Sequence, residues 1–208
     1  MATLLDVTHE IRIDHDNVRD LYTRFKGATD KAEKWAIANT LVREMAIHSD
    51  AEELSVYNEY ARLGLGDTAE HNKGESRACS VQNAADRCAE EHAEVKRLVY
   101  DADTKNFDSP EYDDVMTRAY TGFIEHAKEE EDQQFDKLKA KLTPEENDKI
   151  ARAFLKARTM APSRPHPMAP QSGGILQTAA GMQASLHDKV RVLDPHHRGP
   201  LLIGAAGR

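Results

Sequence analysis

Residues 44–57, EMAIHSDAEELSVY, and residues 123–135, FIEHAKEEEDQQF, repeat one arrangement of polar and aromatic side chains. Each stretch has a histidine with a glutamate four residues later and an aromatic residue nine positions after the histidine. The two pairs are His48 with Glu52 and His126 with Glu130. Residues four apart share one face of a helix. Both pairs fall where the apolar periodicity expects core residues, so we expect them on buried helix faces.

An earlier segment supplies one more histidine to each pair. His15 precedes His48 and His92 precedes His126, so the chain reads H-x32-H-x3-E and then H-x33-H-x3-E. Six buried polar groups would be costly without partners, and two metal ions would remove that cost. Imidazoles and carboxylates suit iron, manganese or zinc, and the two glutamates can bridge the ions. We expect iron, with manganese and zinc as alternatives, whereas a structural zinc site is disfavoured because no thiolate lies on the pattern. The predicted ligands are His15, His48, Glu52, His92, His126 and Glu130.

Helical periodicity and capping signals predict an all-α, up-down-up-down four-helix bundle with a short fifth helix. Ser109 with Pro110 is expected to start the fourth helix, and Thr143 with Glu146 forms a capping box for the fifth. The inner face of the fourth helix is predicted to continue from Glu130 to Lys137. A Gly- and Asp-rich loop is expected at residues 64–76. The expected helices span residues 4–25, 30–63, 77–100, 109–142 and 143–158.

The composition changes after residue 158. Residues 159–208 hold six of the eight prolines and six of the eleven glycines, so we divide the chain into a metal-binding domain, 1–158, and a Pro/Gly-rich extension, 159–208. One amphipathic helix at 175–193 is plausible within that extension. Packing of this helix on the same bundle is preferred over docking to a partner or membrane.

Charge and hydropathy exclude several classes of protein. The 208 residues carry a formal net charge of −8, which disfavours binding to nucleic acid or to an anionic membrane. No run approaches the roughly 18 apolar residues of a membrane span, and the N-terminus lacks a secretory pattern. Two cysteines, Cys79 and Cys88, cannot build a disulfide framework. These features predict a cytoplasmic protein with reduced thiols.

The segments IRIDHDNV, EMAIHSDAEELSVY, AEEHAEVKRLV and FIEHAKEEEDQQF resemble the hemerythrin-like, or HHE cation-binding, domain family over roughly residues 5–158. The resemblance implies an oxo- or hydroxo-bridged di-iron centre held by the six predicted ligands. The oxygen carriers of this family have two histidines on the third iron-binding helix. Here only His92 matches, since Cys88 and Lys96 flank it one turn away. Tyr22 and His71 are candidates for a seventh ligand.

We therefore expect a non-heme di-iron protein that binds O2, peroxide or nitric oxide, for oxygen or redox sensing or for peroxide detoxification. An enzyme of this kind would be catalase- or peroxidase-like, with Tyr57, Phe123 and Phe135 shielding the centre. The alternative is a non-enzymatic regulatory module, dependent on iron or oxygen, whose folding is coupled to metal. A metal-free scaffold would leave the six core polar residues unexplained. The neighbouring acids Glu53, Glu129 and Glu131 are expected on a solvated face.

Overall fold

The computed structural model describes residues 3–63 and 84–166, and this part of the chain is helical with no strand. A helical bundle is thus confirmed. Within the described residues, no helix is both long and apolar enough to cross a membrane. The elements are α1 (Val7–Gly27), α2 (Lys31–Ser55), α3 (Tyr57–Leu63), α4 (Ala84–Thr104), α5 (Tyr112–Glu129), the π-helical segment η1 (Glu130–Gln134), α6 (Phe135–Lys141) and α7 (Pro144–Met160).

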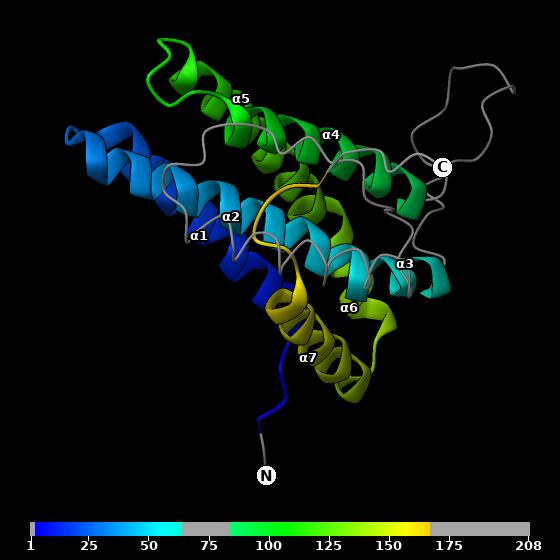
Figure 1. The fold of residues 1–208 in the computed structure, drawn as a ribbon. Coiled ribbons are helices and arrows are strands. Elements are labelled where there is room, and N and C mark those ends of the chain that lie inside the picture. The colour runs from blue at the N-terminus through cyan, green and yellow to red at the C-terminus, as the bar shows by residue number, and fades with distance from the viewer. Residues whose placement is uncertain (1–2, 64–83, 167–208) are drawn as a thin grey trace, which may run out of the picture.

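Four long helices surround the centre of the molecule. In Figure 1, α1 lies beside α2 and α4 lies beside α5, and further contacts join α2 to α4 and α1 to α5. Helix α7 packs on α1 and α2. It has 17 residues, close to the expected span of 143–158, and it buries Ile150, Ala151, Phe154 and Ala157. The fifth helix is therefore part of the core.

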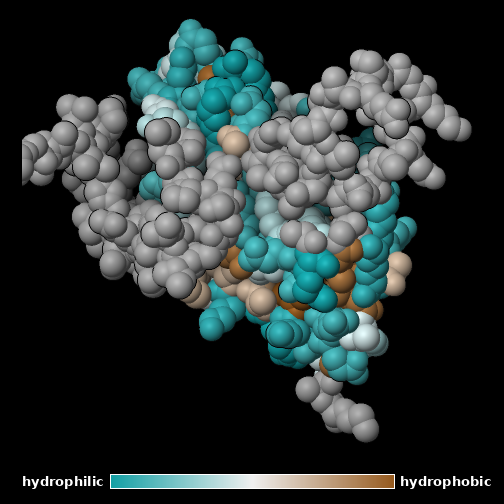
Figure 2. Space-filling model, turned by 90° about the vertical axis from the view of Figure 1, so that its right-hand side faces the viewer, coloured by the Kyte–Doolittle hydropathy of each residue, from teal (hydrophilic) through white to brown (hydrophobic). Residues whose placement is uncertain are grey.

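Two apolar clusters lie on either side of a polar layer. One contains Val18 and Phe25 of α1 together with Met45 and Met116, and the other contains Val7 and Ile11 of α1 together with residues of α7. Along α1 and α2, His15 and His48 fall between members of the two clusters. In the face shown in Figure 2, the described surface is mostly hydrophilic, with a smaller hydrophobic area in its lower half. Polar groups in the middle of the core therefore need a separate explanation.

Local capping chemistry sets two of the helix starts as predicted. The Asp30 carboxylate accepts a hydrogen bond from the Glu33 backbone at 2.8 Å, and Thr143 forms the expected capping box with Glu146. The predicted start at Ser109 is wrong, because α5 begins at Tyr112. The Ser109 amide donates to the Asn106 carbonyl at 2.9 Å, and the Ser109 carbonyl accepts from Tyr112 at 3.0 Å. These bonds close turns ahead of the helix.

The π-helical segment η1 changes which residues face the core after Glu130. The expected inner position, Lys137, is exposed, whereas Phe135 and Leu138 are buried. A π-helix forms i→i+5 hydrogen bonds and so adds a residue to its turn. The backbone amide of Phe135 accordingly donates to the carbonyl of Glu130. The prediction of Lys137 failed because it assumed an unbroken α-helical period.

The start of the predicted extension contacts the bundle. Arg164 donates to Asp103 of α4 at 2.7 Å and to the Asn39 side chain of α2 at 2.8 Å, and Pro162 and Pro165 are buried. The predicted loop 64–76, the first residues of the predicted third helix and the amphipathic helix 175–193 lie outside the described residues. The division of the chain at residue 158 stays a prediction.

Replacing Thr143 with alanine should lower the free energy of unfolding by about 1 kcal/mol, because the amide of Glu146 loses its capping acceptor. Urea unfolding of the purified protein measures this. Thr40→Ala is a matched control, since Thr40 is exposed within α2 and its hydroxyl donates to the Ala36 carbonyl. Alanine favours a helix interior, so the control should cost nothing. Equal losses in both variants would contradict a specific role for the cap.

Candidate metal centre

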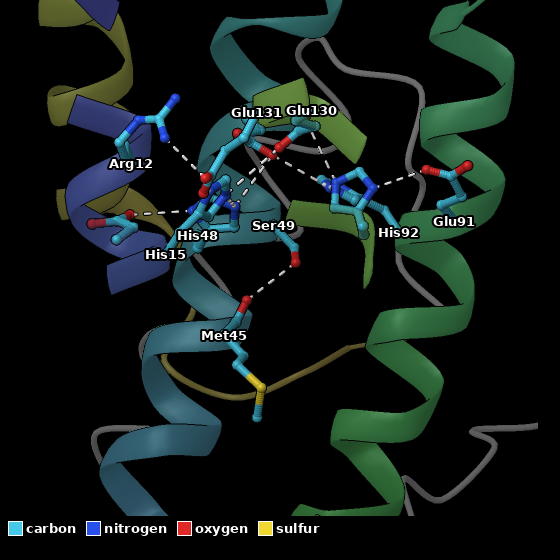
Figure 3. Close-up of polar contacts among 12 residues, drawn as sticks. Arg12, His15, Met45, His48, Ser49, Glu91, His92, Glu130 and Glu131 are labelled. Carbon is cyan, nitrogen blue, oxygen red and sulfur yellow. Dashed lines mark hydrogen bonds and ion pairs between the residues drawn. The ribbon is translucent and has the colours of Figure 1, made fainter. Parts of the chain in front are cut away.

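All six predicted ligands meet in the polar layer. Helices α1 and α2 bring His15 and His48 together with 3.3 Å between their Nε2 atoms, and α4 and α5 bring His92 and His126 together with 2.7 Å between theirs. His126 is 5% exposed and the other five side chains are fully buried. Figure 3 shows the rings of His15 and His48 side by side, with Glu130 reaching toward the centre from η1.

The two glutamates lie between the two histidine pairs. Glu52 Oε2 is 3.4 Å from Nε2 of His48 and 3.4 Å from Nε2 of His92. Glu130 places Oε2 at 3.6 Å from His15 Nε2, and Oε1 at 3.6 Å from His126 Nε2. Each carboxylate therefore faces one histidine of each pair, which is the arrangement that a bridging ligand needs.

The carboxylates of Glu52 and Glu130 are buried, so they need cations nearby if they are to stay ionised. All four side-chain oxygens of Glu52 and Glu130 are buried and accept no hydrogen bond from the described residues. Burial and the nearby charge of Glu52 raise the pKa of Glu130 to about 8. Two cations would let both carboxylates stay ionised, since buried charges are normally paired or bound to metal. Burial also lowers the pKa of His15 to about 4, so its ring is neutral and free to bind a metal.

Two groups of candidate ligand atoms lie close enough together to bind one metal ion each. His15, His48, Glu52 and Glu130 offer atoms within 4.8 Å of one another, and so do Glu52, His92 and His126. Nitrogen and carboxylate donors suit iron, manganese and zinc. The residues present therefore fit two such ions sharing Glu52.

A second set of carboxylates faces the outer nitrogens of the histidines. The Nδ1 atom of each ring lies near one carboxylate oxygen, at 2.8 Å for His15, 3.3 Å for His48, 3.4 Å for His92 and 2.9 Å for His126. The carboxylates are, in that order, Glu131, Asp14, Glu53 and Glu91. A carboxylate at Nδ1 favours the tautomer with its proton there, so the Nε2 lone pair points into the centre.

Sequence reasoning missed this second set and assigned two of its members wrongly. Glu53 and Glu131 were expected on a solvated face, but Glu53 is 1% exposed and the Glu131 side chain 12% exposed. Glu129 is half-buried. Each orienting carboxylate directly neighbours a predicted ligand in the sequence, but so do Asp16, Glu125 and Glu129, so adjacency alone does not identify the set. Asp14 and Glu91 precede His15 and His92, while Glu53 and Glu131 follow Glu52 and Glu130.

Three of the orienting carboxylates are paired with basic side chains. Glu131 contacts Arg12 and Arg19, Asp14 contacts Arg158 of α7, and Glu53 contacts Lys96. Hydrogen bonds from His15 and then Arg19 outweigh desolvation and lower the pKa of Glu131 to about 2. The acids that hold the rings are themselves held in place.

Aromatic rings surround the histidines. The Phe123 ring meets His48 edge-on at 5.0 Å between centroids, Phe135 stacks on His15 at 6.2 Å, and Tyr57 lies 4.9 Å from His92. The seventh ligand proposed at Tyr22 is not brought to the centre, because its hydroxyl donates to Thr117 at 2.9 Å and its ring stacks on Tyr120. His71 and the side chains of Cys79 and Cys88 lie outside the described part of the chain.

Two curated proteins are similar to this chain. A hemerythrin-like protein of Schizosaccharomyces pombe is 27% identical over 180 residues, which cover 86% of this chain and 81% of the relative. A DNA nickase of Nostoc sp. strain PCC 7120 is 22% identical over 77% of this chain, but the match covers only 41% of the nickase. No family model and no solved structure matches. The similarity to the yeast protein over most of the chain, together with the buried histidine and glutamate cluster, supports a hemerythrin-like family.

Proposed function

We propose that the chain holds two iron ions among ligands from α1, α2, α4, α5 and η1. At these ions it binds O2, peroxide or nitric oxide, either to sense the molecule or to consume it. The observation that carries the proposal is the pair of buried carboxylates of Glu52 and Glu130, which accept no hydrogen bond from the described residues and each face both histidine pairs. The hemerythrin-like name of the yeast relative favours iron over manganese or zinc.

The proposed fold behind this centre is an up-down-up-down bundle of α1, α2, α4 and α5. Contacts join these helices in a ring, α1 to α2, α2 to α4, α4 to α5 and α5 to α1. Within the first hairpin, Lys34 at the start of α2 lies over the Phe25 ring near the end of α1. Further from this turn, toward the start of α1 and the end of α2, His15 and His48 meet. That pairing is the one expected of antiparallel neighbours.

Iron, when bound, supplies a redox-active position that takes a small diatomic molecule or peroxide as a ligand. The chain's own residues supply the rest. The Nε2 atoms of the four histidines would hold the ions, Glu52 and Glu130 would supply carboxylate ligands to them, and the carboxylates at Nδ1 keep the rings oriented. Phe123, Phe135 and Tyr57 exclude water from the ligand side of the rings.

Metal analysis of aerobically purified protein, combined with its near-ultraviolet and visible spectrum, tests the proposal. We expect about two irons per chain and absorption typical of a bridged ferric pair. Azide should change this spectrum if an external ligand can reach the ions. Folded protein that lacks iron and is unchanged by ferrous ion added anaerobically would rule the di-iron assignment out.

A second candidate is a regulatory module without turnover, and the burial of the candidate ligands in the core favours it. The ligands come from α1, α2, α4, α5 and η1, and five of the six are fully buried, so loss of metal would loosen the whole bundle. Oxygen release or substrate oxidation on addition of peroxide separates the two candidates. Metal-dependent melting without either reaction would support the module.

The proposal includes no nucleic-acid partner. The DNA nickase is named for an activity on DNA, but the match spans less than half of it. The net charge of −8 disfavours contact with a polyanion. A cytoplasmic location is likewise part of the proposal and rests on the sequence.

A further inference from the structure

One lysine is buried beside the metal centre. Lys96 of α4 is 3% exposed, although lysine is almost never fully buried unless it is paired. Its Nζ lies 2.5 Å from Asp50 Oδ1 and 2.7 Å from Glu53 Oε2, both on α2. Both carboxylates are buried as well. The three groups form a buried ion cluster that joins α2 to α4.

The cluster reaches one histidine. While Glu53 Oε2 accepts the hydrogen bond from Lys96, Glu53 Oε1 lies 3.4 Å from Nδ1 of His92. Lys96 also follows His92 by one helical turn. Its ammonium group is engaged by two carboxylates and so is not free to bind a metal.

The other basic groups that hold orienting carboxylates are more accessible. The side chains of Arg12, Arg19 and Arg158 are 47%, 32% and 23% exposed, against 3% for Lys96. Water screens charge pairs, so a pair shielded from water fixes its geometry more strongly than one at the surface. Of the three carboxylates Glu131, Asp14 and Glu53, the one that faces His92 therefore has the least accessible basic partner.

We propose that Lys96 is a positioning residue: by fixing Glu53 it sets the orientation of His92 and so the affinity of one of the two metal positions. This inference rests on the proposed metal centre. It assigns the buried lysine a role that the ligand pattern does not contain. It also predicts that the two metal positions respond differently when the lysine is lost.

Anaerobic ferrous titration of the Lys96→Met variant tests the inference. Loss of an outer partner typically weakens metal binding about 10–100-fold. We expect one of the two ions to weaken by that factor and the other, on the His15 side, to keep its affinity within about threefold, well under that effect. Two ions bound with the parent's affinities would overturn the inference.

Arg164→Met is the matched control. Arg164 also pairs with a buried carboxylate of α4, Asp103, at 2.7 Å, but neither residue contacts a predicted ligand. The control should lose stability without changing either metal affinity. An equal loss of metal in Arg164→Met would show that Lys96 acts only through general stability, and would also overturn the inference.

The double variant Lys96→Met/Asp50→Asn covers the case in which the single variant does not fold. It removes one positive and one negative charge together, so the buried cluster keeps its net charge while Glu53 still loses its lysine. We expect the same selective weakening of one ion.

A readout without metal separates this inference from the proposed function. If the parent binds no iron, the proposed function fails, but NMR of the ring nitrogens still reports the tautomer of His92. The parent should hold the proton on Nδ1, and the Lys96 variants should populate both tautomers. An unchanged His92 tautomer in the variants would contradict the positioning role, whatever the metal content.

Discussion

The Glu52→Gln variant should lose both metal ions together, whereas His126→Ala should weaken mainly one. Glu52 Oε2 lies 3.4 Å from the inner nitrogen of His48 and equally far from that of His92, so its negative charge serves both positions. Glutamine keeps the size of the side chain and removes that charge. Even the loss of an outer partner weakens metal binding about 10–100-fold, so we expect a loss of at least about 100-fold at both positions.

Ferrous titration with metal analysis of each variant measures this difference. Glu59→Gln is the control, because Glu59 of α3 pairs with Arg62 at 2.5 Å and contacts no predicted ligand. It should bind two ions as the parent does. A Glu52→Gln protein that retains one ion at full affinity would show that Glu52 is a terminal ligand of a single metal and not a bridge.

The six candidate ligands could be found from the sequence because each sits at a core position that an apolar residue would otherwise occupy. Their positions follow from the helical period and from the repeat of the same His, His and Glu spacing in the second pair of helices. The starts of α2 and α7 were equally accessible, since Asp30 and Thr143 cap helices through bonds spanning three residues. These two local capping signals were therefore predicted, whereas the start expected at Ser109 was not found.

The orienting carboxylates could not be placed in the same way. Glu53 and Glu131 stand in acidic runs, which normally face solvent. Their burial depends on cations from other helices, Lys96 of α4 for Glu53 and the arginines of α1 for Glu131. Such pairings appear only once the helices are packed.

The π-helical segment η1 shows a different limit. Nothing in the hydrophobic period signals an added residue between Glu130 and Phe135, yet that residue decides that Phe135 stacks on His15 and that Lys137 is exposed. π-Segments frequently occur at functional sites, where they re-aim side chains. Here the segment carries both Glu130, a candidate ligand, and Glu131, an orienting acid.

Removing the metal should cost more stability than any single substitution considered above. Without cations, the oxygens of Glu52 and Glu130 remain buried with no hydrogen bond from residues 3–63 and 84–166, between rings that face fixed carboxylates. A ligand present at 1,000 times its Kd stabilises the native state by about 4 kcal/mol, so two independent ions contribute about 8 kcal/mol. At roughly 2–4 °C per kcal/mol for a chain of this size, chelation should lower Tm by about 15–30 °C.

Thermal melting before and after anaerobic chelation, followed by metal restoration, measures this effect. Ferrous ion should restore Tm, because the centre offers four imidazoles that suit it. Magnesium should not, since it requires oxygen ligands in near-ideal octahedral geometry. Iron-free protein that melts at the temperature of the loaded form would mean that the buried carboxylates are neutralised by protons instead. The reason for two buried glutamates among four histidines would then have to lie outside metal binding.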